Sequence, residues 1–116
     1  MARLSTHVLD ASRGKPAEGV VIDLHALVSG QRRHLKTVAT NTDGRAAEPL
    51  LSGESEPGVY ELTFHAGDYF RAHGVQLPEP PFLDEVIIRF GIADVAGNYH
   101  VPLLLSPYSY STYRGS

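Results

Sequence analysis

The chain has 116 residues, enough for one domain, and its 42% hydrophobic and 20% charged residues are ordinary values for a globular protein. Its net charge of −3 offers no electrostatic basis for binding nucleic acid or an anionic membrane. Because the sequence contains no cysteine, disulfides, thiolate catalysis and thiolate metal sites are excluded.

The sequence also shows no targeting or membrane segment. Its first residues lack the apolar run of a signal peptide, and no apolar stretch approaches the ~20 residues of a membrane-spanning helix. We therefore expect a single soluble domain over residues 1–116, located in the cytoplasm.

Alternation of apolar and polar residues predicts β-strands along most of the chain, because side chains two apart in a strand share a face. The expected strands, in chain order, cover residues 4–10, 20–28, 33–40, 58–65, 83–93, 99–105 and 108–113. Between them we expect a loop over 11–19, a turn over 41–45, an irregular connection with a brief strand over 46–57, an extended loop around 78–81 and a hairpin loop over 94–98.

One short helix is expected over residues 66–74, where Gly74 would follow its last turn. Seven or eight short strands without a βαβ rhythm predict an all-β fold, an antiparallel β-sandwich.

The last stretch of the chain, residues 99–116, is predicted to form two strands joined by a turn. Residues 99–105 alternate, with Tyr99, Val101, Leu103 and Leu105 on one face, and Ser106-Pro107 turns the chain. The second half is rich in tyrosine, serine and threonine, which favour a further strand in hairpin with the first. Tyrosines near the chain's end are unusual for a disordered tail, so we expect this terminus to be pinned inside the structure.

Histidine and arginine side chains are the candidates for chemistry. The alternation places His7 and His100 off the apolar faces of their strands, and imidazole exchanges protons near neutral pH. A surface histidine is more often structural than catalytic, and we assign that role to the other four, His25, His34, His65 and His73. Arg45, next to Asp43-Gly44, would ordinarily be a solvated turn residue.

Two apolar side chains interrupt otherwise polar strand faces. Leu104 shares a face with His100, and Ile87 shares one with Arg89. Large exposed apolar groups usually mark an interface, so this pattern indicates that another subunit covers the face.

Several motifs resemble the transthyretin-related 5-hydroxyisourate hydrolases. They are L-S-T-H-V-L-D at 4–10, G-K-P-A at 14–17, T-N-T-D-G-R at 40–45, G-V-Y-E-L-T-F at 58–64, Y-H-V-P-L-L-L-S-P-Y-S-Y-S-T-Y at 99–113 and the terminal Y-R-G-S at 113–116. The resemblance covers essentially the whole chain, and the terminal tetrapeptide is its most specific part. Transthyretin itself is similar through S-P-Y-S-Y-S-T but departs after it, and it lacks a histidine at the place of His7.

The resemblance implies a transthyretin-like β-sandwich that assembles as a homotetramer, a dimer of dimers, with active sites in clefts at a subunit interface. It implies hydrolysis of 5-hydroxyisourate, the product of urate oxidation, to 2-oxo-4-hydroxy-4-carboxy-5-ureidoimidazoline without a required cofactor. The catalytic residues that it carries over are His7, Arg45, His100 and Ser116. For substrate binding it implies His7, Arg45, Tyr113 and Arg114.

The chemistry of these side chains suits hydrolysis. A histidine that activates water contributes roughly 10²–10⁴-fold, and we expect His7 to be the general base with His100 as its partner or proton relay. The guanidinium of Arg45 can stabilise the negative charge that develops on the attacked carbonyl oxygen. Tyr113 and Ser116 can donate hydrogen bonds that orient the ring.

Two alternatives stay open. A noncatalytic carrier of transthyretin type would bind a small aromatic ligand without turning it over. A zinc site would need distant residues such as His7 and His100 to converge, since no close histidine pair is present, and we expect no metal requirement.

Overall fold

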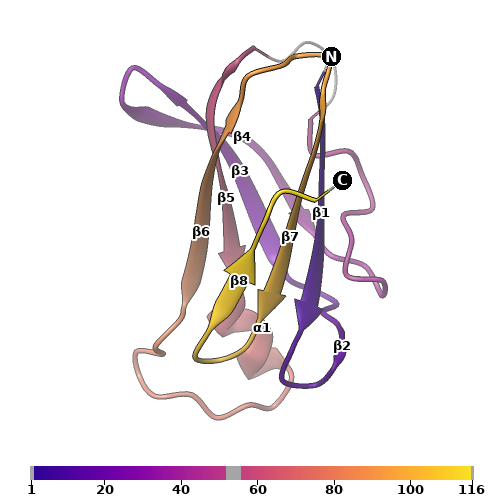
Figure 1. Cartoon of the computed structure of the whole chain (residues 1–116). Coiled ribbons are helices and arrows are strands. Elements are labelled where there is room, and N and C mark those ends of the chain that lie inside the picture. The colour runs from indigo at the N-terminus through magenta and orange to yellow at the C-terminus, as the bar shows by residue number, and fades with distance from the viewer. Residues whose placement is uncertain (1, 52–55, 116) are drawn as a thin grey trace.

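Two four-stranded sheets face each other in the computed structural model, which describes residues 2–51 and 56–115 (Figure 1). The elements are β1 (Arg3–Asp10), β2 (Lys15–Pro16), β3 (Val21–Val28), β4 (Gln31–Ala39), β5 (Gly58–His65), α1 (Ala66–Ala72), β6 (Glu85–Ile92), β7 (Asn98–Leu105) and β8 (Tyr110–Thr112). One sheet has the strand order β2-β1-β7-β8 and the other β4-β3-β5-β6. The predicted all-β sandwich with one short helix is confirmed.

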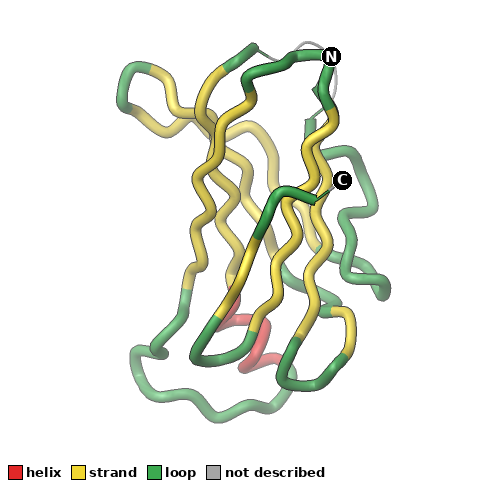
Figure 2. The backbone as a smooth tube through the Cα atoms, in the orientation of Figure 1, coloured by secondary structure: helices red, strands yellow, loops and turns green. Residues whose placement is uncertain are grey.

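The core lies between the sheets, where alternate side chains of each strand point inward. Its fully buried residues include Val8, Ile22, Leu24, Leu62, Phe64, Leu103 and Leu105. Helix α1 closes one end of the sandwich (Figure 2). Its residues Tyr69 and Phe70 are buried. The predicted apolar face of residues 99–105 is confirmed, because Tyr99, Val101, Leu103 and Leu105 are all buried.

One strand pair differs from its neighbours. β1 and β7 run parallel, whereas every other pair in the two sheets is antiparallel. Alternation is the same in both directions, so it does not determine strand orientation. The parallel register places Ser5 opposite His100 and His7 opposite Pro102.

The connections differ from prediction at three places. The expected loop over 11–19 contains the short strand β2, which pairs with the end of β1. Within 46–57, the described residues form no strand, and the brief strand is reduced to bridges at Arg45 and Ala46; residues 52–55 lie outside the described part. The last strand begins at Tyr110 rather than Tyr108, because Ser106 and Ser109 close a hydrogen-bonded turn.

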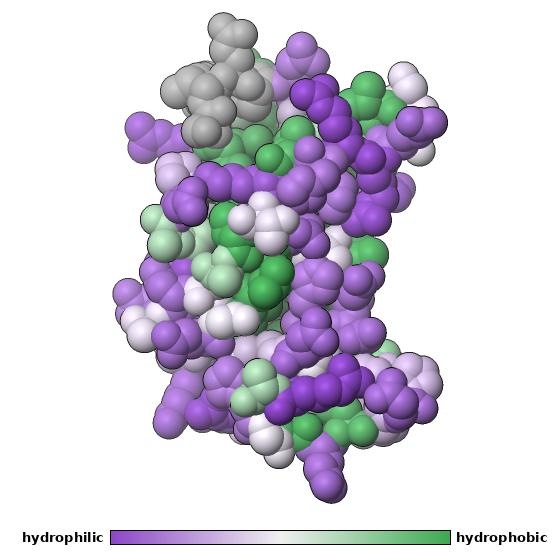
Figure 3. All heavy atoms as spheres, turned by 180° about the vertical axis from the view of Figure 1, so that it is seen from behind, coloured by the Kyte–Doolittle hydropathy of each residue, from purple (hydrophilic) through white to green (hydrophobic). Residues whose placement is uncertain are grey.

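The outer face of sheet β4-β3-β5-β6 carries both hydrophilic and hydrophobic side chains (Figure 3). The exposed large hydrophobic residues of these strands are Val21, Val28, Leu35, Val59 and Ile87. Glu61 at its centre accepts bonds from Arg32 and Arg89, and His65 contacts Asp23. These pairs belong to the sheet opposite the one that carries His7 and His100, so this face is not part of the predicted site.

Candidate functional site

Strands β1 and β7 place His7 and His100 on the outer face of sheet β2-β1-β7-β8. The neighbours Val8 and Val101 are buried in the core, so the histidines before them in each strand project the other way. Because His100 lies opposite Ser5, and His7 follows Ser5 by two residues, the histidines occupy adjacent positions of the same face. The sequence prediction that both leave the apolar face is confirmed.

The turn over residues 41–45 brings Arg45 beside β1. The side-chain oxygen of Asn41 accepts hydrogen bonds from the backbone N–H groups of Asp43 and Arg45, at 2.9 and 3.1 Å. Gly44 has φ of 75°, and its carbonyl accepts a 2.8 Å bond from Val8. A methyl group at Gly44 would collide with the backbone oxygen of Val8, so glycine is required for both conformation and space. As a consequence, the backbone of Arg45 pairs with that of His7 in an isolated antiparallel β-bridge.

The chain end lies across β7 on the surface, rather than inside the structure as predicted, and Tyr108, Tyr110 and Tyr113 are 61%, 44% and 62% exposed. The N–H of Gly115 donates a 2.8 Å bond to the carbonyl of His100, and the two residues form a bridge. The guanidinium of Arg114 donates to the carbonyl of Asn98 at 3.2 Å and stacks over the ring of Tyr99, 4.4 Å from its centroid. Ser116, a predicted catalytic residue, lies outside the described residues.

The His100 ring is partly exposed and hydrogen-bonded. Its Nδ1 lies 2.8 Å from the hydroxyl oxygen of Ser5. Burial lowers the pKa of His100, and electrostatic interaction with Arg45 and then with His7 lowers it further. A lowered pKa keeps the imidazole neutral near pH 7, which is the form that accepts a proton.

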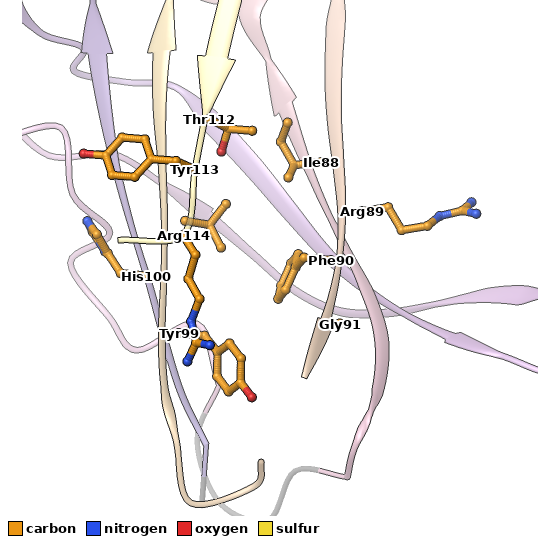
Figure 4. A pocket seen from close by; sticks show the side chains of 10 residues that line it. Ile88, Arg89, Phe90, Gly91, Tyr99, His100, Thr112, Tyr113 and Arg114 are labelled. Atoms are coloured by element: carbon orange, nitrogen blue, oxygen red, sulfur yellow. The ribbon is translucent and has the colours of Figure 1, made fainter. Parts of the chain in front are cut away.

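A pocket of about 340 Å³ opens beside this group, between the edge strand β6 and the chain end (Figure 4). Its lining residues are Ile88, Arg89, Phe90, Gly91, Tyr99, His100, Val101, Thr112, Tyr113 and Arg114. In Figure 4, His100 and Tyr113 lie on one side of β7, whereas Ile88 and Phe90 lie on the other. His7 and Arg45 do not line this pocket; Arg45 borders a second hollow of about 330 Å³ with Ser5.

The structure therefore brings together His7, Arg45, His100 and the backbone of the chain end, all on one face. Tyr113 is 62% exposed and free to turn toward a ligand, whereas the guanidinium of Arg114 is engaged with Asn98 and Tyr99. Sequence reasoning missed Ser5, although it shares its strand face with His7. The signal was that two-residue spacing, but its contact with His100 depends on the register between two strands.

Residues 2–51 and 56–115 contain neither a metal-binding cluster nor a membrane-spanning helix. In this part of the chain, no group of three or more histidine, aspartate or glutamate side chains could hold a metal ion. Among the same residues, no helical segment has the length and apolar character needed to span a bilayer.

Two facing sheets, with polar residues of β1, β7 and the chain end gathered on the outside of one, define a transthyretin-like β-sandwich protein. The model of the HIUase/Transthyretin family matches residues 4–115, and the chain belongs to this family.

Individual relatives are similar over the whole chain. The 5-hydroxyisourate hydrolase of Pseudomonas aeruginosa is 59% identical over 100% of this chain and 93% of its own length. Among solved structures, the Klebsiella pneumoniae 5-hydroxyisourate hydrolase has 36% identity and a TM-score of 0.84, with 100% of each chain covered. An (S)-allantoin synthase has 45% identity and a TM-score of 0.92 over 99% of this chain, which spans only 44% of that protein.

Proposed function

We infer that this chain is an enzyme that hydrolyses 5-hydroxyisourate in urate degradation. The observation that carries the inference is its 59% identity with a 5-hydroxyisourate hydrolase over the full chain. The motif residues His7, Arg45 and His100 lie on one face, which is consistent with this activity. The product is 2-oxo-4-hydroxy-4-carboxy-5-ureidoimidazoline, and no cofactor is needed for a hydrolysis that side chains can catalyse.

The reaction begins with attack of water on a ring carbonyl of the substrate. His7 is the general base that removes the proton from water, and His100 accepts or relays it, helped by a pKa lowered by burial and nearby charge. Arg45, whose backbone pairs with that of His7 in an isolated β-bridge, stabilises the negative oxygen of the tetrahedral intermediate through its guanidinium. Collapse of this intermediate breaks the cyclic C–N bond, and the nitrogen takes up the relayed proton.

Substrate contacts come from the chain end. Tyr113 and Ser116 orient the ring by hydrogen bonds, and His7 and Arg45 contact it directly. Arg114 lines the pocket of about 340 Å³, and its guanidinium is bonded to the Asn98 carbonyl and stacked over the Tyr99 ring. The remaining N–H groups of the guanidinium can donate to the substrate.

We further propose a homotetramer, a dimer of dimers, in which a neighbouring subunit covers the site. Support comes from the outer face of β1 and β7, where Leu9 and Leu104 are only half-buried by this chain. A neighbouring copy would bury both leucines and exclude water from the histidines. The cytoplasmic location and the single domain over 1–116 stay predictions.

The activity is tested by mixing the protein with freshly generated 5-hydroxyisourate and following its ultraviolet decay and the chirality of the product. We expect a rate well above the spontaneous one, and His7→Ala should lower turnover by about 10²-fold or more with an unchanged circular dichroism spectrum. His34→Ala, on the opposite sheet, is the matched control. A noncatalytic carrier would leave the spontaneous rate unchanged.

A further inference from the structure

The imidazole of His100 is held on one edge by β1. Its Nδ1 lies 2.8 Å from the hydroxyl oxygen of Ser5, directly opposite in the parallel register. Ser5 projects from the same face as His7, so the hydrogen bond crosses between the strands on the outer surface of the sheet. This bond fixes the rotation of the ring about its χ2 angle.

The chain end holds the opposite edge of the same ring. A methyl group built on Gly115 would overlap Cδ2 of His100 and lie 3.1 Å from its Cγ. The backbone of Gly115 cannot retreat freely, because its N–H donates a 2.8 Å bond to the carbonyl of His100. Glycine is therefore needed here for space, since its φ lies outside the left-handed region.

With Nδ1 occupied, the second ring nitrogen is the one left for chemistry. Nε2 of His100 has no hydrogen-bond partner within residues 2–51 and 56–115, and it adjoins the Cδ2 edge beside the chain end. We propose that Ser5 and Gly115 are positioning residues, which hold the His100 ring so that Nε2 exchanges the proton. This proposal rests on the proposed hydrolysis, because it assigns His100 a proton-transfer role in it.

A serine hydroxyl is suited to this task because it can either donate or accept a hydrogen bond. When Nδ1 carries the proton, it donates to the Ser5 oxygen and Nε2 is free to accept a proton. When a neutral ring carries its proton on Nε2, the Ser5 hydroxyl donates to Nδ1 instead. A carboxylate in place of Ser5 would accept only, and its negative charge would favour the imidazolium form.

The test compares the wild-type chain with Ser5→Ala, Ser5→Thr and Gly115→Ala. Nitrogen-15 NMR of the histidine rings reports the state of each ring nitrogen, and ultraviolet kinetics with 5-hydroxyisourate give kcat and KM. We expect Ser5→Ala to change the His100 ring signals and to lower kcat about tenfold, the order expected for one lost hydrogen bond, with little change in KM. Ser5→Thr, which keeps the hydroxyl, should restore both readouts, and Gly115→Ala should displace the His100 signals as well.

Controls come from the same spectrum and the same sheet. His73, whose Nδ1 lies 3.0 Å from the carbonyl of Tyr69, should keep its signals in every variant. Ser111→Ala removes an exposed hydroxyl for which the described residues offer no side-chain hydrogen bond, and it should leave the His100 signals in place. Unchanged circular dichroism spectra would show that all variants fold.

The outcomes separate this proposal from the activity on which it rests. Unchanged His100 signals and unchanged kcat in Ser5→Ala would overturn the positioning role. A loss of kcat that Ser5→Thr does not rescue would also overturn it, because the hydroxyl would then not be the relevant group. If the wild-type chain leaves the spontaneous rate unchanged, the proposed hydrolysis fails, while the ring signals still decide whether Ser5 and Gly115 hold His100.

Discussion

His100 illustrates how single residues set the chemistry of this surface. Its strand position is apparent from the sequence, but its proton affinity depends on what surrounds the ring. Burial and electrostatic interaction with Arg45 and His7 lower its pKa, although Arg45 is more than fifty positions away in the chain. The effect exists because the turn over residues 41–45 delivers Arg45 to the edge of β1.

Replacing Arg45 should therefore raise the pKa of His100. A nearby positive charge disfavours the imidazolium, so Arg45→Met removes one cause of the lowered pKa and moves it toward the ordinary value of 6.5. The measurement is an NMR pH titration of the His100 ring. Arg33→Met, an exposed change on β4, is the matched control. A pKa that stays in place would show that the charge of Arg45 is not one of its causes.

At the scale of elements, helix α1 is tied to the end of β1 by a buried carboxylate. The Asp10 carboxylate accepts a 2.8 Å bond from the Tyr69 hydroxyl and further bonds from the backbone N–H groups of Ser12 and Arg13. Burial, followed by the hydrogen bond to Asp10, raises the pKa of Tyr69 to about 12. The helix is thus held by polar as well as apolar contacts.

We expect Tyr69→Phe to destabilise the protein by about 1–3 kcal/mol, because it leaves one buried oxygen of Asp10 without its donor. Urea unfolding at neutral pH measures this loss. Tyr110→Phe removes a hydroxyl from a 44% exposed tyrosine and should change the free energy of unfolding little. Equal stability of the two variants would contradict a structural role for the Tyr69–Asp10 bond.

The strands of the opposite sheet carry a second buried carboxylate. Glu61 is 4% exposed, and its oxygens lie 2.9 Å from Nε of Arg89 and 3.0 Å from Nε of Arg32. The hydrogen bond from Arg89 is the main reason that the pKa of Glu61 lies below its ordinary value. A depressed pKa stabilises the fold at pH values above the unfolded-state pKa, and this stabilisation is lost as the pH falls through the folded-state pKa.

Glu61→Gln should consequently weaken the pH dependence of the free energy of unfolding in the acidic range. The free energy of unfolding of wild type should exceed that of the variant at neutral pH, and the gap should shrink as the pH falls through the region below 4.5. Urea unfolding at several pH values measures the gap, with the exposed Glu48→Gln as the control. A gap independent of pH would contradict the ionised Glu61 as its cause.

At the scale of the whole molecule, the two outer faces differ in what they carry. One face, called here the histidine face, bears His7, His100, Arg45 and half-buried leucines, whereas the other bears paired charges around Glu61 together with exposed apolar side chains such as Ile87. We propose that the histidine face is the one covered in the tetramer, because its apolar groups lie beside the site. Covering it would complete a cleft that a single chain leaves open.

Placing a charge on this face should then break the assembly. Leu104→Glu would bury an unpaired carboxylate at the interface, so we expect a smaller mass by light scattering at micromolar concentration and a loss of activity. Leu35→Glu introduces the same charge on the opposite sheet, where Leu35 of β4 is 37% exposed, and should leave the mass unchanged. A smaller mass for the control variant and an unchanged mass for Leu104→Glu would show that the interface lies on the other sheet.

Much of the site could be predicted because strand alternation is a local property. The outward position of His7 and His100 follows from the buried residues beside them, and the turn at Gly44 follows from a residue type that positive φ demands. The partner of Ser5 and the anchoring of Arg114 on Tyr99 could not be predicted, since both require residues from separate strands to meet.

By itself the sequence determined the β-rich class, the apolar face of each long strand and the family motifs, since these depend on residue identity and on spacing along the chain. Only the tertiary structure decided that β1 and β7 run parallel, and with that register that Ser5 meets His100. The physical reason is that alternation with period two reads the same in either direction, whereas pairing between distant strands depends on how the whole core packs.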